Sequence, residues 1–305
     1  MAESSDFLAT KRIAVVTGAN KGIGIEICRQ LVLKGITVVL TARDVKKGVE
    51  AVEKLKGSST CSYFFDNLIF HQLDVVDASS IAHLADFIKT EFGKLDILVN
   101  NAAVIGINVD LTAVRASTSS KQGLYINWSE VSTQNYELAE ECLKINYYGA
   151  KNVAEALIPL LQLSDSARIV NISSSSGKLK FVSNEWAKGI LSDANSLTEE
   201  KVDAVLNEFL TDISANLLED KGWPSILTAY TLSKAAMNAY TRILAKKYPN
   251  LLINSICPGY VKTDMNYNRG VSSVEEGAES PVWLALLPDG APSGFFFSRK
   301  DISSF

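Results

Sequence analysis

The chain has 305 residues, of which 47% are hydrophobic, and its formal net charge is -4 at pH 7. This length and apolar content allow a large buried core, and the slightly acidic balance argues against nucleic acid or an anionic membrane as a partner. The first ten residues lack the apolar core of a signal peptide, and no apolar run reaches membrane-spanning length. The cysteines form no CxxC pair and are expected to be reduced, buried thiols of a cytoplasmic protein: Cys28, Cys61, Cys142 and Cys257.

The first half of the chain alternates short apolar strands with amphipathic helices. The run at 36–41, ITVVLT, is almost wholly apolar, as expected when helices cover both faces of a parallel sheet. The periodicity predicts strands at 12–17, 36–41, 70–75 and from 95, with helices at 25–35, 49–55 and 81–92 between them. This alternation predicts an α/β fold with a doubly wound parallel sheet.

The second half continues the pattern with longer elements. A long amphipathic helix is predicted at 136–163, a strand at 168–173, a helix from about Tyr230, and a strand from Leu251. The count reaches about seven strands, with helices on both faces. We expect one Rossmann-type domain over residues 1–305.

Two segments interrupt this rhythm. Residues 105–135 are rich in Ser, Thr and Gly and are too long for an ordinary connection, which predicts a substrate loop or lid. Residues 175–224 contain a capping box from Ser196 to Glu199, followed by apolar residues at helical spacing. The second segment is therefore predicted to be a packed helical insertion within the domain.

A glycine-rich turn, TGANKGIG, joins the first strand to the first helix at residues 17–24. Glycines let backbone amides approach a pyrophosphate, and the positive end of the helix dipole stabilises it. The spacing departs from GxGxxG, but the strand, turn and helix around it meet the structural test for a dinucleotide site. The predicted cofactor contacts in this turn are Gly18, Asn20, Lys21, Gly22, Ile23 and Gly24.

Basic residues follow the second strand, where a cofactor with a free ribose 2′-hydroxyl would call for Asp or Glu. Arg43 suits a 2′-phosphate through forked hydrogen bonds, and Lys21 and Lys47 could add positive charge. This favours NADP(H) as the cofactor. The alternative is a set of solvated surface cations that Asp44 partly neutralises.

Tyr230 and Lys234 lie four residues apart in a segment of good helix formers, so both can point into one cleft. A phenol has an unperturbed pKa of about 10. A neighbouring ammonium would lower that pKa by favouring the phenolate. Taken alone, a Tyr and a Lys at this spacing are expected by chance in most proteins.

Taken in order, TGxxxGxG, the NNAA run at 100–103, an Asn in a long helix, Ser173-Ser174 and YxxxK resemble the short-chain dehydrogenase/reductase family over nearly the whole chain. The resemblance implies that Ser174, rather than Ser173, hydrogen-bonds a substrate carbonyl and that Tyr230 donates the proton. It implies that Lys234 binds the ribose and lowers the pKa of Tyr230, and that Asn146 anchors a water relay.

The same resemblance assigns further cofactor contacts. Asp74 and Val75 would lie near the adenine, and Asn101 and Ala102 would line the ribose. The loop that holds the nicotinamide amide would include Pro258, Gly259, Val261 and Thr263. No metal site is visible, and the only two histidines, His71 and His83, are interpreted as structural.

The interval between Ser174 and Tyr230 is several times longer than is usual in the family. In this respect the chain resembles a carbonyl reductase-like plant subgroup of the family. This resemblance implies an NADPH-dependent reductase that converts a ketone of secondary metabolism to an alcohol. An alkaloid ketone is favoured, with Ile107, Val109 and Asp110 as substrate contacts and Asp110 pairing with an ammonium. A monoterpenoid ketone or a broad carbonyl substrate is the alternative. A non-catalytic NADP(H)-binding regulator is the least favoured hypothesis, and the insertion implies a monomer.

Overall fold

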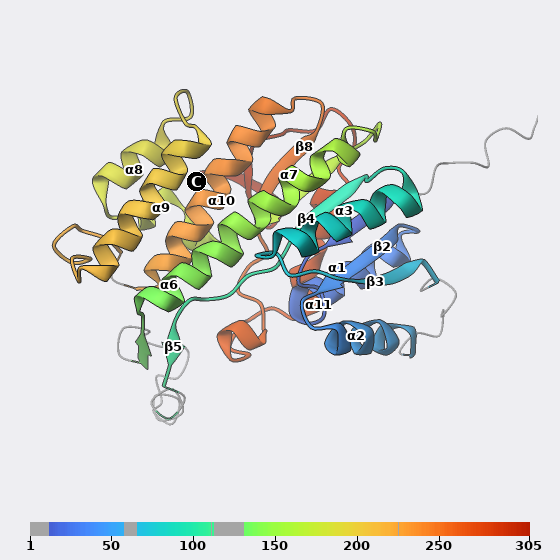
Figure 1. The fold of residues 1–305 in the computed structure, drawn as a ribbon, viewed down its shortest axis with the longest axis horizontal. Helices are drawn as coiled ribbons and strands as arrows, with labels where there is room; N and C mark the ends of the chain where they lie inside the picture. Colours follow the sequence, from blue (N-terminus) through green and yellow to red (C-terminus); the bar gives the residue numbers. More distant parts are fainter. Residues whose placement is uncertain (1–11, 58–65, 111, 113–130, 225) are drawn as a thin grey trace, which may run out of the picture.

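An eight-stranded, mostly parallel sheet runs through the molecule (Figure 1). The computed structural model describes residues 12–57, 66–110, 112, 131–224 and 226–305. The strand order is β10-β9-β8-β7-β4-β1-β2-β3, and only the β9–β10 pair is antiparallel. The strands are β1 Ile13–Val16, β2 Thr37–Ala42, β3 Leu68–Gln72, β4 Ile97–Asn100, β7 Arg168–Ile172, β8 Leu252–Cys257, β9 Phe296–Ser298 and β10 Asp301–Ser303.

The order in which successive strands are added to the sheet changes direction at β1. It runs outward from β1 through β2 to β3, and then returns to place β4 on the other side of β1. Every residue of β1, β2 and β4 is buried, in agreement with their apolar sequences. Crevices at such a switch point, beyond the carboxyl ends of the strands, are where ligands bind in open α/β sheets.

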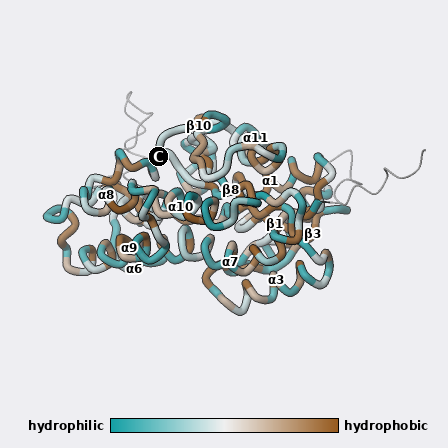
Figure 2. The backbone as a smooth tube through the Cα atoms, turned by 90° about the horizontal axis from the view of Figure 1, so that it is seen from above, coloured by the Kyte–Doolittle hydropathy of each residue, from teal (hydrophilic) through white to brown (hydrophobic). Residues whose placement is uncertain are grey.

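Helices cover both faces of the sheet, each with its own apolar core (Figure 2). One face carries α1 Gly22–Leu33, α2 Val45–Gly57 and α11 Val274–Ala285. The other carries α3 Ala78–Phe92, α7 Ala150–Leu161 and α10 Thr228–Lys247. The predicted doubly wound architecture is confirmed, and the two short strands β9 and β10 at one end of the sheet raise the strand number above the seven expected. Segments of three residues are too short to show a sequence period.

The long helix expected at 136–163 is divided in two. The π-helical turn η2, Lys144–Gly149, separates α6, Tyr136–Leu143, from α7. Each α-helical part has its own buried face, so the sequence period survives across the junction. A π turn widens the helix by one residue, and such turns are frequent at functional sites. Asn146 lies inside this turn.

The insertion forms two packed helices beside α10, α8 Glu185–Ser192 and α9 Glu199–Ser214 (Figure 1). The predicted capping box is wrong in one respect, because Thr198 and not Ser196 caps α9. The Thr198 hydroxyl accepts from the backbone N–H of Lys201, whereas the Ser196 hydroxyl donates to Asp193. The apolar face of α9 is fully buried, as expected: Val202, Val205, Leu206 and Phe209.

The predicted lid at 105–135 lies largely outside the described residues. Its described ends form a two-stranded ribbon of β5, Asn108–Val109, and β6, Ser132–Thr133. Cys28, Cys142 and Cys257 are buried free thiols, and Cys61 lies outside the described residues. Among the helices described, none combines the length and apolar character needed to cross a bilayer.

Candidate active site

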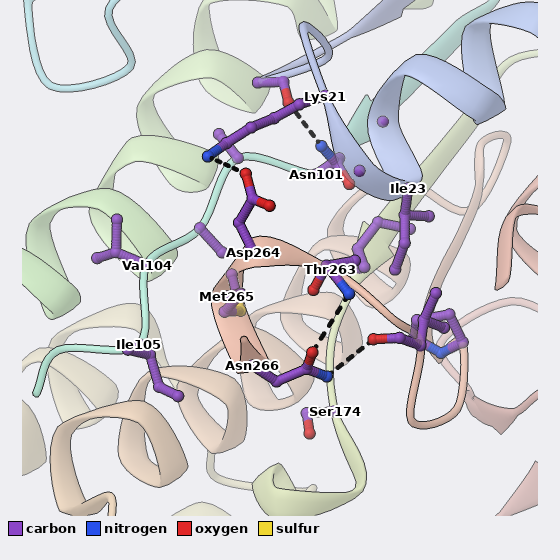
Figure 3. A pocket seen from close by; sticks show the side chains of 18 of the residues that line it. Lys21, Ile23, Asn101, Val104, Ile105, Ser174, Thr263, Asp264, Met265 and Asn266 are labelled. Atoms are coloured by element: carbon purple, nitrogen blue, oxygen red, sulfur yellow. Dashed lines mark hydrogen bonds and ion pairs between the residues drawn. The ribbon is translucent and has the colours of Figure 1, made fainter. Parts of the chain in front are cut away.

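A cavity of about 990 Å³ opens at the carboxyl ends of the parallel strands. Its walls come from the turn after β1, from Arg43 after β2, from Asp74 after β3, and from the segments after β4, β7 and β8. Residues far apart in sequence therefore meet at the switch point. Eighteen side chains of the lining are drawn in Figure 3.

The glycine turn packs tightly against the residues that follow β4. Gly18 has a φ of +60°, and a Cβ placed on it would come within 2.8 Å of Ala102 Cα. A Cβ on Gly24 would come within 2.5 Å of Asn101 Nδ2, which instead donates to the carbonyls of Thr17 and Gly18 at 2.9 and 3.1 Å. The Thr17 hydroxyl accepts from the backbone N–H of Asn101 and of Ala102. Asn101 and Ala102 thus fix the shape of the turn.

The start of α1 is suited to an anion. Lys21 occupies the N-cap position and makes no side-chain capping hydrogen bond, so no side chain caps the first N–H groups of α1. A dipole end of this kind, beside a turn made narrow by glycines, is the arrangement that binds a pyrophosphate. The residues present therefore fit a dinucleotide.

Three cations were expected to lie near a 2′-phosphate, and their surroundings in the structure differ. Arg43 is exposed and lines the cavity. Lys47 does not line it, and its ammonium lies 4.0 Å from the Asp44 carboxylate. Lys21 lines the cavity but pairs with Asp264 at 2.9 Å. Arg43 remains the cation of this group without a carboxylate partner in the described part of the chain.

The cavity also brings the predicted catalytic groups together. Tyr230 and Lys234 project from the first two turns of α10, and Ser174 follows β7. The Ser174 side chain lies beside Tyr230, close enough to lower its pKa. The Ser173 hydroxyl is buried and donates instead to the backbone carbonyl of Lys234 at 3.4 Å. Ser174 is therefore the serine that faces Tyr230.

Burial governs the protonation of this pair. It raises the pKa of Tyr230 above the ordinary value of a phenol, against the smaller lowering effect of the Ser174 side chain. It also lowers the pKa of Lys234 to about 8. The Lys234 ammonium donates to the Ile172 carbonyl at 2.8 Å and lies 5.7 Å from the centre of the Tyr230 ring. Lys234 was expected to lower the pKa of Tyr230, and this remains a prediction. With a pKa raised by burial, Tyr230 is a neutral phenol at pH 7.

Asn146 is fully buried and does not line the cavity. Its Oδ1 accepts from the Val104 N–H at 2.8 Å, and its Nδ2 donates to the Val104 carbonyl at 2.9 Å and to the Ser233 hydroxyl at 3.0 Å. The Ser233 hydroxyl in turn donates to the Tyr230 carbonyl at 2.8 Å. The amide of Asn146 thus ties the strand-end segment at Val104 to the helix that carries Tyr230.

The other predicted cofactor contacts all line the cavity: Gly18, Asn20, Gly22, Ile23, Gly24, Asp74, Val75, Asn101, Ala102, Pro258, Gly259, Val261 and Thr263. The three predicted substrate contacts do not. Ile107 is buried, Val109 pairs with Ser132 in the small ribbon, and the Asp110 carboxylate accepts from the backbone N–H of Thr112 at 2.8 Å. Asp110 therefore serves as a local turn-capping group.

Several lining residues have no counterpart in the sequence reasoning. They include five apolar side chains and one carboxylate on α6: Val104, Ile105, Ile145, Leu227, Met265 and Glu141. Glu141 and Ile145 lie four positions apart and lead directly to Asn146, so their helical spacing was a usable signal. Among the described residues, no group of three or more His, Cys, Asp and Glu side chains could hold a metal ion.

A sequence model of one family, described as short chain dehydrogenase, matches residues 12–185 and 220–272. The chain belongs to the short chain dehydrogenase family. The unmatched interval, residues 186–219, contains the whole of α9. The helical insertion is therefore an addition to the part that the family model describes.

Relatives in this family extend over nearly the whole chain. A (+)-neomenthol dehydrogenase from Arabidopsis thaliana is 60% identical over 97% of this chain and 99% of its own length. The solved structure of salutaridine reductase from Papaver somniferum is 57% identical, covers 94% of this chain and 99% of that one, and gives a TM-score of 0.89. Menthone neomenthol reductase from Mentha piperita is 50% identical over 96% and 100% of the two chains, with a TM-score of 0.83.

Proposed function

We propose that this short chain dehydrogenase uses NADPH to reduce a ketone of plant secondary metabolism to a secondary alcohol. The observation that carries the proposal is the Tyr230–Ser174 pair, which faces the same cavity as the glycine turn. The names of the plant relatives support a dehydrogenase or reductase of this kind.

The proposed chemistry assigns each group one task. The Ser174 and Tyr230 hydroxyls bind and polarise the carbonyl oxygen, and Tyr230 gives its proton to that oxygen as negative charge develops. NADPH supplies the hydride when it is bound. Lys234 would hold the cofactor ribose, and its ammonium stabilises the phenolate that Tyr230 becomes after it gives up its proton. Asn146 acts behind them by fixing α10 against the segment at Val104.

Arg43 supports the preference for NADP(H) over NAD(H). Its guanidinium lines the cavity after β2, where it can form forked hydrogen bonds with a 2′-phosphate. We assign the adenine side to Asp74 and Val75, and the nicotinamide side to the segment from Pro258 to Thr263.

Beside the apolar residues Val104, Ile105 and Ile145, the cavity lining contains the carboxylate of Glu141. Asp264 is neutralised by Lys21, whereas no ion pair engages Glu141 in the described part of the chain. We therefore replace Asp110 by Glu141 as the group that would pair with the ammonium of an alkaloid ketone. The apolar wall of Val104 and Ile105 favours the second candidate, a monoterpenoid ketone, which needs no charged partner.

A ketone screen tests the proposal. Salutaridine, menthone and a panel of simple ketones would be incubated with the protein and NADPH, with the loss of NADPH absorbance followed and product chirality determined. Turnover of either cyclic ketone is expected. Tight NADPH binding without turnover of any ketone would favour the non-catalytic regulator, and turnover by a folded Tyr230→Phe variant at the wild-type rate would exclude Tyr230 as the acid.

The insertion supports a monomer formed by one domain. Glu199 at the start of α9 pairs with Lys151 of α7 at 2.9 Å and with Lys247 of α10 at 3.6 Å. α9 thereby covers a face of α10 that would otherwise be open to a second subunit. Sedimentation at micromolar concentration should give the mass of one chain, and we propose the cytoplasm as its compartment.

A further inference from the structure

Lys21 and Asp264 join opposite walls of the cofactor cavity. Lys21 belongs to the glycine turn before α1, and Asp264 begins the short helix η5, Asp264–Asn266, beyond β8. The Lys21 ammonium donates to the Asp264 carboxylate at 2.9 Å. Figure 3 shows the two side chains reaching toward each other. Both residues line the cavity, so the ion pair links two of the segments that form its wall.

The segment that presents Asp264 is held in shape. Thr263 and Asn266 form a capping box, in which the Thr263 N–H donates to Asn266 Oδ1 at 3.2 Å. Asn266 Nδ2 also donates to the Val261 carbonyl at 2.8 Å, and the turn ends at Tyr267 with a left-handed φ of 55°. The Asp264 carboxylate is therefore carried by a preformed turn and not by a free loop.

The same two walls approach at a second point. A Cβ on Gly22 would lie 3.6 Å from Thr263 Cγ2, which is ordinary contact distance. The glycine turn and the segment after β8 are therefore adjacent at Gly22 and Thr263 as well as at Lys21 and Asp264.

We propose that Lys21 and Asp264 form an ionic clasp that closes over the bound dinucleotide and controls how fast it exchanges. The side chains of Lys21 and Asp264 are 65% and 64% exposed, so water can replace each partner and the pair can open. A weak, solvated pair suits this task, because a buried pair would cost far more to separate. The inference rests on the proposed dinucleotide site.

An ionic clasp and simple repulsion of the cofactor by Asp264 predict opposite changes in the rate of NADPH release. If Asp264 only repelled the cofactor phosphates, Asp264→Asn would bind NADPH more tightly and release it more slowly. If Asp264 holds the clasp closed, the same variant releases NADPH faster, by about twofold to fivefold for an exposed ion pair. Its association rate should not fall.

Stopped-flow displacement measures this directly. Wild type, Asp264→Asn and Asp264→Glu would be loaded with NADPH and mixed with excess NADP⁺, and the NADPH fluorescence would report release. The difference between wild type and Asp264→Asn should be present at about 0.01 M salt and disappear at about 1 M, where exposed pairs are screened. Asp264→Glu should keep the slow release.

Glu140→Gln is the matched control, because it breaks an exposed Lys–Glu pair of 3.0 Å on α6 outside the cavity lining. Its release rate should equal that of wild type. Equal or slower release from Asp264→Asn, or a difference that survives high salt, overturns the clasp while leaving NADPH binding intact. Failure of every variant to bind NADPH would overturn the dinucleotide site and the clasp together.

Discussion

Replacing Asn146 by Ala distinguishes a role in positioning α10 from a direct role in a proton relay. The substitution removes the acceptor of the Val104 N–H and the donors to the Val104 carbonyl and the Ser233 hydroxyl, all in a fully buried site. A buried polar group left without a partner costs about 1–3 kcal/mol. Both polar groups of Val104 lose their partner, whereas Ser233 keeps its hydrogen bond to the Tyr230 carbonyl. We therefore expect the free energy of unfolding to fall by about 2–4 kcal/mol.

Urea unfolding of the apoprotein and of the NADPH-loaded protein measures this loss, and steady-state kinetics on the same samples measure its effect on the site. Because Val104 and Tyr230 both shift, KM and kcat should change together. Ser233→Ala, which leaves both hydrogen bonds between Asn146 and Val104 in place, should show a smaller effect of the same kind. An Asn146→Ala variant as stable as wild type, with kcat alone reduced, would refute the positioning role and favour a direct role in a proton relay.

Three further predictions concern charge. The pKa of Lys234 is lowered to about 8, so Lys234 is an ammonium below that pH and the rate of ketone reduction should fall as pH rises through 8. In Lys234→Arg this fall in rate should move to higher pH. A fall that stays at the same pH would assign it to another group. Arg43→Asp should shift the ratio of kcat/KM values toward NADH, and an unchanged ratio removes Arg43 from that role. Glu141→Gln should raise KM about twofold to fivefold for an amine-bearing ketone and leave a neutral ketone unaffected, with Glu140→Gln as the silent control.

Local patterns were sufficient for the architecture because each depends on neighbours in the chain. The apolar runs predicted the buried parallel strands, the glycines predicted the turn before α1 that lines the cavity, and the four-residue spacing of Tyr230 and Lys234 placed both on one face of α10. Errors appeared where a choice lay between adjacent candidates. Ser196 and Thr198 are both residue types that cap helices. Because the Ser196 hydroxyl donates to Asp193, Thr198 is the residue that caps α9.

The sequence by itself determined the fold class, the glycine turn before α1, and the placement of Tyr230 and Lys234 on one face of α10. The tertiary structure decided which of two serines meets Tyr230, and that Glu141 rather than Asp110 faces the cavity. It also decided that burial sets the pKa values of Tyr230 and Lys234. These outcomes depend on contacts between segments far apart in the chain, and on the exclusion of water that follows from them, neither of which a local period encodes.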